Sequence, residues 1–164
     1  MPHFTTRRIV PHTPEQMFDL VADVERYPQF LPLCESLTVL SREPIDGGER
    51  IIARMSVGYG LVRETFKTDV RLLRQTRQIA VRYLEGPFRH LDNTWDFRPG
   101  DFQPHAGGGP AQVGCEVVFF IDYEFRSLPL QLLMGAMFDR AFRKFAEAFE
   151  ARAAQVYGQP APST

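Results

Sequence analysis

The run from Val113 to Arg126 constrains the fold more than any other part of the sequence, because apolar and more polar side chains alternate along it. The apolar or aromatic set is Val113, Cys115, Val117, Phe119, Ile121, Tyr123 and Phe125. A period of two is typical of a β-strand with one buried face. At about 3.3 Å per residue this strand extends ~45 Å, whereas a typical strand has only five or six residues. A strand of this length has to curl, so we expect a sheet that bends around another element.

The C-terminal segment supplies an element around which such a sheet can bend. From Pro129 to Tyr157 the sequence has no further proline and only one glycine, which predicts a single helix of about 28 residues, ~42 Å long. Charged residues occupy most of its surface, and the remaining stripe is apolar. That stripe contains Leu130, Met134, Met137, Phe138, Ala141, Phe142, Phe145, Ala148, Phe149 and Val156.

The rest of the chain reads as one strand, one short helix and a series of antiparallel strands. Residues 3–10 alternate as a strand, and Thr13 and Pro14 favour a helix that runs to about Val24. The segment 27–34 contains two prolines and has room for one helical turn at most. The long β region that follows is broken at residues 44–48, 58–60, 75–77 and 86–87.

This order of elements predicts an α+β fold in which a curved antiparallel sheet wraps around a long C-terminal helix. We expect one domain over residues 1–157, a glycine-rich loop at 104–110 and a disordered tail at 158–164. Because a strongly curved sheet and a straight helix do not mate along their whole length, we also expect an interior cavity between them.

Composition excludes several classes of protein. The 164 residues are 44% hydrophobic and 24% charged, which excludes a disordered chain. No apolar stretch approaches the ~20 residues that cross a bilayer, and the N-terminus lacks the apolar core of a signal peptide. The formal net charge of −1 argues against a protein that mainly coats nucleic acid. We therefore expect a cytoplasmic protein.

No motif of known catalytic or metal-binding spacing occurs in the chain. There is no GxSxG, no P-loop and no GxGxxG after a strand, so we expect a protein that is not an enzyme. We expect no metal site, because the histidines are scattered at His3, His12, His90 and His105. Cys34 and Cys115 lack CxxC spacing and are expected to be free, buried thiols.

Polar residues fall in the inward register of two predicted strands. Glu64 and Thr68 share a face with Phe66, and Asn93 shares a face with Trp95. A glutamate on an apolar face has to be paired, protonated or close to water. Glu64 meets an arginine, or lies at a wet rim, or, together with Asn93, orients the polar head of a ligand in an otherwise apolar pocket.

Two further segments each allow a structural and a functional interpretation. The aromatic, proline-rich segment 27–33 is either a rigid corner or a lid whose Phe30 and Leu31 form a membrane-touching rim. Arginines cluster near the predicted turn at 75–77, where they either keep a hairpin soluble or contact lipid phosphates or RNA. They are Arg71, Arg74, Arg77 and Arg82.

Two sequence stretches and the final helix resemble a known family. YPQFLPLCESLTVL (27–40), GPFRHLDNTWDF (86–97) and the aromatic stripe of the last helix resemble the coenzyme Q-binding protein family of the START superfamily. Bacterial members of this family are also described as polyketide cyclase-like proteins and as the ribosome association toxin RatA. The resemblance covers about residues 2–157, and a glycine-rich insertion at 107–109 departs from it.

The resemblance implies a START- and birch-allergen-like helix-grip fold and a non-catalytic role. It implies that the chain binds ubiquinone in an apolar tunnel, without a further cofactor, and supports respiratory electron transport at the inner face of the cell membrane. We expect Tyr27, Phe30 and Leu31 at the tunnel mouth and Glu64 and Asn93 as its polar contacts. The expected interior residues are Phe66, Trp95, Phe119, Tyr123, Met134 and Phe138.

Two alternatives stay open. A ribosome-binding translation inhibitor would contact RNA through Arg71, Arg74 and Arg77. A polyketide cyclase or aromatase would need an acid–base pair in the pocket, and only Glu64 and the tyrosines offer one. The tail length of the quinone and the oligomeric state are not determined by these patterns.

Overall fold

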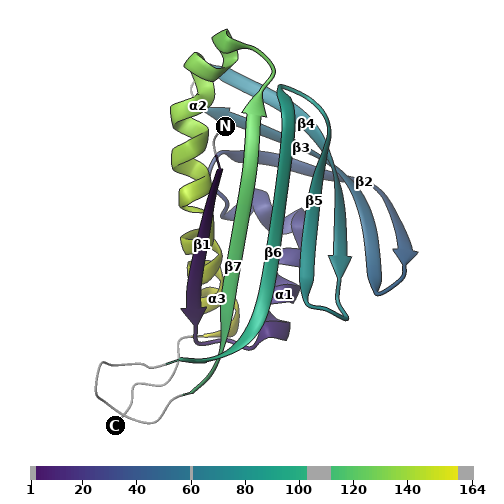
Figure 1. Ribbon diagram of the computed structural model, residues 1–164, viewed down its shortest axis with the longest axis vertical. Helices are drawn as coiled ribbons and strands as arrows, with labels where there is room; N and C mark the ends of the chain where they lie inside the picture. The colour runs from purple at the N-terminus through teal and green to yellow at the C-terminus, as the bar shows by residue number, and fades with distance from the viewer. Residues whose placement is uncertain (1–2, 60, 103–111, 159–164) are drawn as a thin grey trace.

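The computed structural model describes residues 3–59, 61–102 and 112–158, which form one curved sheet with helices on its concave side (Figure 1). The strands are β1 (His3–Val10), β2 (Cys34–Ile45), β3 (Gly48–Tyr59), β4 (Val62–Leu73), β5 (Gln78–Glu85), β6 (Phe88–Phe102) and β7 (Gln112–Phe125). The helices are α1 (Pro14–Ala22), the 3-10 helix η1 (Val24–Gln29), α2 (Leu128–Arg143) and α3 (Phe145–Tyr157). The predicted α+β fold, a curved antiparallel sheet closed by C-terminal helices, is confirmed.

All neighbouring strands in the sheet are antiparallel, in the order β1-β7-β6-β5-β4-β3-β2. The long pair at its centre, β6 and β7, runs from Phe88 opposite Phe125 to Phe102 opposite Gln112. The odd residues of β7 from Cys115 to Phe125 are all buried, as the alternation predicted. One face of this sheet therefore forms the wall of the core.

The C-terminal segment is not the single helix that its sequence predicts. It divides at Lys144 into α2 and α3. The amide of Lys144 donates to the carbonyl of Ala141, three residues back, at 3.0 Å, as in the tighter turn of a 3-10 helix. The prediction of one uninterrupted helix was wrong. It relied on proline and glycine to mark a helix break, and this break involves neither. It allows α2 to pack on β7 while α3 packs on α1 and β1.

The start of α1 follows the expected capping chemistry. The Thr13 hydroxyl accepts a hydrogen bond from the Gln16 amide at 3.1 Å, and the Gln16 side chain accepts one from the Thr13 amide at 2.9 Å. This capping box satisfies two amides that the first helical turn leaves without partners. The helix ends at Ala22, two residues before the predicted boundary, and η1 follows with Pro28 inside it.

The loop predicted at 104–110 and the tail after Gly158 lie outside the described residues. Within the described ranges, no helix is both long and apolar enough to cross a membrane.

Candidate functional site

Side chains from adjacent strands form the wall of a cavity on the concave face. Strand register aligns Val70, Val81 and Asn93 across β4, β5 and β6. The wall continues through Met55, Phe66, Ile79, Leu91 and Trp95, and the helices cover it with Phe138, Ala141, Phe142, Phe145 and Phe149. The curved sheet and the helices therefore leave a hollow between them, where the sequence placed it.

The cavity is small in this closed arrangement. Its volume is about 90 Å³. An engineered cavity of ~150 Å³ accommodates a benzene ring, and ligand pockets usually measure ~300–1,000 Å³. A quinone ring with a prenyl tail therefore enters only when side chains or the covering segments move.

The polar groups of the cavity wall are few, and most are already hydrogen-bonded. Asn93 Nδ2 donates to the Phe120 carbonyl at 2.8 Å, and Trp95 Nε1 donates to Asn93 Oδ1 at 3.2 Å. The Tyr27 hydroxyl donates to the Val21 carbonyl, and burial, followed by the nearby Cys34 and Asp23, raises its pKa. One N–H and one lone pair of Asn93 are left over, together with the hydroxyl of Thr68.

The wall carries no charge. None of the described lining residues is an Asp, Glu, Lys, Arg or His. Thr68 is 7% exposed and forms no hydrogen bond to another described residue. A guest in this cavity therefore meets an apolar wall with two neutral polar points, which favours an uncharged molecule with one or two hydrogen-bond acceptors.

Glu64 does not occupy the position that the sequence predicted for it. It lies opposite Val57 on the inward register of β4, but it is half-buried and does not line the cavity. Its carboxylate lies near Tyr83, whose pKa is raised mainly by burial and, to a smaller extent, by Glu85 and Glu64. The polar point on β4 is Thr68, four residues further along the same face of the strand. Alternation placed both residues on this face but did not show which one reaches the hollow.

The mouth segment is folded inward. Tyr27 and Leu31 line the cavity, and Leu31 is 5% exposed. The Phe30 ring lies outside the lining and packs edge-on against Phe149, with ring centroids 5.1 Å apart, and the Arg152 guanidinium covers it at 5.2 Å. Because Leu31 is buried and Phe30 is partly covered, this arrangement favours the rigid corner over a membrane-touching rim.

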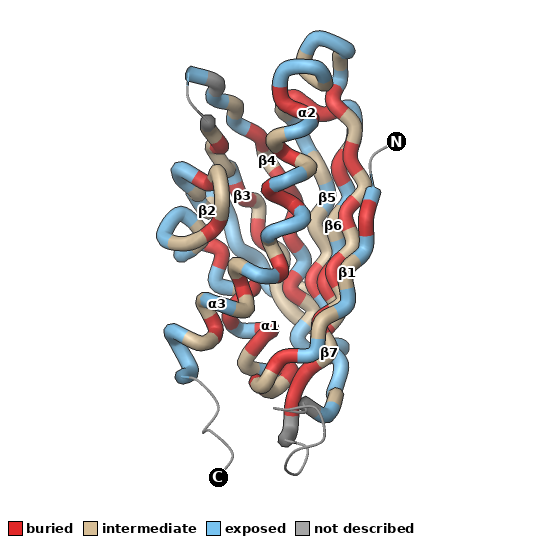
Figure 2. Tube along the Cα trace, turned by 90° about the vertical axis from the view of Figure 1, so that its left-hand side faces the viewer, coloured by how far each residue is buried: buried red, intermediate tan, exposed pale blue. Residues whose placement is uncertain are grey.

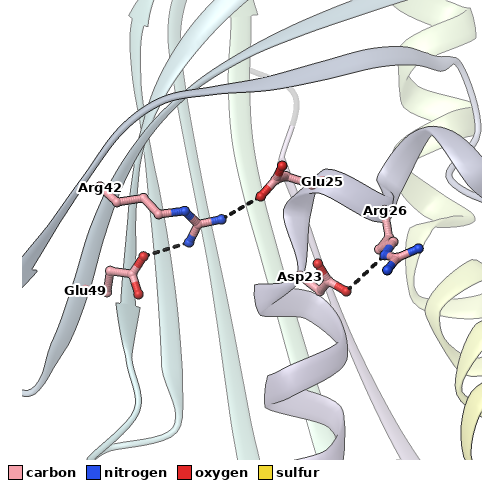
Figure 3. A network of polar contacts seen from close by, with 5 residues as sticks. All are labelled: Asp23, Glu25, Arg26, Arg42 and Glu49. Carbon is pink, nitrogen blue, oxygen red and sulfur yellow. Dashed lines mark hydrogen bonds and ion pairs between the residues drawn. The ribbon is translucent and has the colours of Figure 1, made fainter.

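Ion pairs that the sequence did not reveal hold this segment against the edge of the sheet. Arg42 of β2 contacts Glu25 of η1 at 2.9 Å and Glu49 of β3 at 2.7 Å (Figure 3). The Gly58 amide also donates to the Leu33 carbonyl at 3.0 Å. Residues 24–33, which we call the lid, thus cover one side of the cavity and are tied to β2 and β3. No sequence pattern signals a pair such as Arg42 and Glu25.

Three predicted interior residues lie behind the lining. Phe119, Tyr123 and Met134 are each 1% exposed but do not face the cavity. The Phe119 ring supports Trp95 at 4.6 Å between centroids, and Tyr123 supports Phe142 at 4.9 Å. Burial raises the pKa of Tyr123 to about 12. The other interior residues, Phe66, Trp95 and Phe138, line the cavity directly.

The arginine cluster is engaged within the protein. Arg74 pairs with Asp19 of α1 at 2.5 Å, and Arg77 pairs with Glu15 at 2.5 Å. Arg71 lies 3.7 Å from Asp69. Arg74 and Arg77 thus join the β4–β5 hairpin to α1, a role that neither interpretation of the sequence included.

Comparison with known proteins connects this architecture to a family. Over residues 10–150 the sequence matches the family described as polyketide cyclase / dehydrase and lipid transport. It is 31% identical to the ribosome association toxin RatA of Escherichia coli K12, over 96% of this chain and 90% of that protein. It is also 31% identical to the mitochondrial coenzyme Q-binding protein COQ10 homolog B of Xenopus laevis, over 95% of this chain and 59% of that protein.

Solved structures agree in fold. An 18 kDa protein from Caulobacter crescentus is 33% identical, with a TM-score of 0.71 over 97% of this chain and 100% of that one. The Zhui aromatase/cyclase from Streptomyces sp. R1128 has a TM-score of 0.73 over 99% of each chain. Its 19% identity shows a shared fold alone.

Proposed function

Since the chain belongs to the polyketide cyclase / dehydrase and lipid transport family, we propose that it is a non-catalytic carrier of ubiquinone or a similar prenylated quinone. The proposal depends on one observation above all. The cavity wall is apolar and uncharged, and its free hydrogen-bonding groups come from Asn93 and Thr68. A quinone ring is neutral, and its two carbonyl oxygens are acceptors that suit two such groups.

The similarity to a coenzyme Q-binding protein supports this choice of guest. A prenyl tail gains about 0.8 kcal/mol for each CH2 group that it buries, so partial enclosure already gives useful affinity. Because the closed cavity is too small, loading requires the lid or α2 to move. A carrier of this kind acts in the cytoplasm at the inner face of the cell membrane and supports respiratory electron transport.

A short-tail ubiquinone analogue tests the proposal, and its binding is measured as the shift in the Tm of the protein. A ligand at 100 times its Kd stabilises the folded state by about 2.7 kcal/mol, so we expect a clear rise in Tm. An alkylbenzene of equal tail length, which lacks the two carbonyl oxygens, serves as the matched ligand. Thr68→Val should weaken analogue binding about tenfold and leave alkylbenzene binding unchanged.

Two results would count against the proposal. One is the absence of quinone in organic extracts of the protein purified from its native cells, together with no Tm shift on adding the analogue. The other is equal binding of the analogue and the alkylbenzene, which would leave an apolar cavity with no preference for the quinone head.

The similarity to a ribosome association toxin supports a second candidate, a ribosome-binding inhibitor. The predicted contact residues Arg74 and Arg77 are paired with acids of α1, which weakens that candidate. Co-sedimentation with large ribosomal subunits at low and high salt tests it, because phosphate contacts lose affinity steeply with salt. Salt-sensitive binding that Arg71→Gln reduces would favour this function.

A cyclase or aromatase activity finds less support in the cavity. General acid–base catalysis needs a positioned group that titrates near the working pH. Among the described lining residues the titratable side chain is Tyr27, whose pKa is raised by burial and whose hydroxyl is bonded to Val21. Glu64 lies outside the lining, so Glu64→Gln should leave quinone binding intact.

A further inference from the structure

The first three turns of α2 are unusual for a helix on a protein surface. From Leu128 to Phe138 the sequence contains no charged residue. Helix α3, of similar length, contains Glu147, Glu150 and Arg152. A surface helix ordinarily presents charged residues to water, so the outer face of α2 resembles a face that meets an apolar phase.

Three leucines make up most of this outer face. Leu128 is 69% exposed, Leu132 is 78% exposed and Leu133 is 63% exposed. Spacing by four residues extends the face to the exposed Ala136 and the half-buried Met137. We call Leu128, Leu132 and Leu133 the α2 leucine face.

The α2 leucine face lies at one end of the molecule, where α2 begins (Figure 1). The start of α2 and the β3–β4 turn are at the same end in both views (Figures 1 and 2). Leu61 in that turn is fully exposed. Along α2, the row that contains Leu133 and Met137 continues to Ala141, which lines the cavity. An apolar path therefore leads from the leucine face to the cavity wall.

Exposed arginines flank this apolar face. Arg126 lies two residues before α2, and Arg140 follows its uncharged part; neither forms an ion pair with a described acidic residue. The nearby carboxylate of Asp139 is bound by Arg143 at 3.0 Å. Apolar side chains bordered by arginines suit the boundary between acyl chains and anionic headgroups.

We propose that the α2 leucine face docks onto an anionic phospholipid bilayer. Its exposed apolar area is roughly 300–400 Å², about half of the ~800 Å² that each partner buries in a standard protein interface. The area is therefore too small for a stable dimer, whereas three leucines and neighbouring arginines are enough for reversible binding to a membrane surface. The use of this docking to load the cavity rests on the proposed function, but the docking itself does not.

Flotation with phosphatidylcholine vesicles, with and without 30% phosphatidylglycerol, tests the proposal. Wild-type protein should float with the anionic vesicles, and Leu132→Gln with Leu133→Gln should reduce the bound fraction at least tenfold. Glutamine keeps a high helix propensity, so the helix should persist. The matched control replaces Leu84 and Val156, which are 47% and 51% exposed on β5 and α3, with glutamine and should float as wild type does.

Two further measurements test whether charge contributes to membrane binding and whether the leucine face instead binds a second copy of the chain. Arg126→Gln should weaken binding to anionic vesicles several-fold, and higher salt should have a similar effect. Equal flotation of the wild type and the double leucine variant would overturn the proposal. So would sedimentation of the wild type as a dimer that the double variant dissociates, because the occupant would then be a second copy of the chain.

The same variants distinguish this proposal from the proposed function. Binding of a water-soluble quinone analogue should be unchanged in Leu132→Gln with Leu133→Gln, because neither side chain lines the cavity. Flotation without analogue binding would overturn the carrier function and leave the docking surface in place. Analogue binding without flotation would overturn the docking surface and leave the carrier function in place.

Discussion

Asn93 shows how one side chain serves both the stability and the chemistry of the cavity. Its amide connects the Trp95 indole to the Phe120 carbonyl and keeps one N–H for a guest. Thr68 makes no comparable contact with another described side chain or carbonyl. Substitution at these two positions should therefore affect stability very differently.

Asn93→Leu should lower the free energy of unfolding by about 2 kcal/mol, because it leaves the buried Trp95 N–H without an acceptor. Thr68→Val should change it by less than about 0.5 kcal/mol, since no internal hydrogen bond is lost. Chemical denaturation of both variants at one pH checks the difference. A large loss in Thr68→Val would mean that its hydroxyl has a structural partner.

The buried thiols should make the protein sensitive to alkaline pH. Burial raises the pKa of Cys115 from 9.0 to about 12 and that of Cys34 to about 11. Because the unfolded state loses these protons first, the stabilisation of the thiol form is complete below pH 9 and is lost as the pH rises through 9 toward 12. Between pH 8 and 10, wild type should lose about 1 kcal/mol more than Cys115→Ala. An equal fall in the free energy of unfolding of the two proteins over this pH range would contradict the prediction.

At the scale of elements, the lid is held by contacts of two kinds. Its aromatic side chains pack against α3, where the Tyr27 and Phe149 ring centroids are 5.3 Å apart. Its outer side is tied to the sheet edge through Glu25 and Arg42. Exposed ion pairs contribute little to global stability, so the second kind of contact is better suited to setting how often the lid opens.

Arg42→Gln should therefore change ligand kinetics more than stability. We expect a fall of less than 1 kcal/mol in the free energy of unfolding. Association and dissociation rates of a quinone analogue should both rise several-fold, so that Kd changes little. Arg98→Gln, which removes the pair with Asp96 on β6, away from the lid and α2, is the control and should leave both rates unchanged. Unaltered rates in Arg42→Gln would mean that the guest enters elsewhere.

Across the whole molecule, the features with strong periodicity were predictable from the sequence and those that depend on long-range contacts were not. Alternation along β7 and the apolar stripe of the last helix were sufficient to predict a curved sheet that closes on helices. The break at Lys144 and the pair of Arg42 with Glu25 have no local signature. Alternation also could not decide between Glu64 and Thr68, because both occupy the same face of β4 and only the position of the cavity separates them.

The strongest test at this scale uses the size of the cavity. Phe145 lines it and is half-buried, so Phe145→Ala should enlarge it and lower the free energy of unfolding by about 2–3 kcal/mol. Phe18→Ala removes a buried ring that packs on Phe97 outside the cavity and should cost about 3–4 kcal/mol. A quinone analogue should raise the Tm of Phe145→Ala by more than it raises that of wild type, because the guest fills the new space. In Phe18→Ala the analogue should give only the wild-type rise. Equal rises in all three proteins would show that the guest does not bind between the sheet and the C-terminal helices.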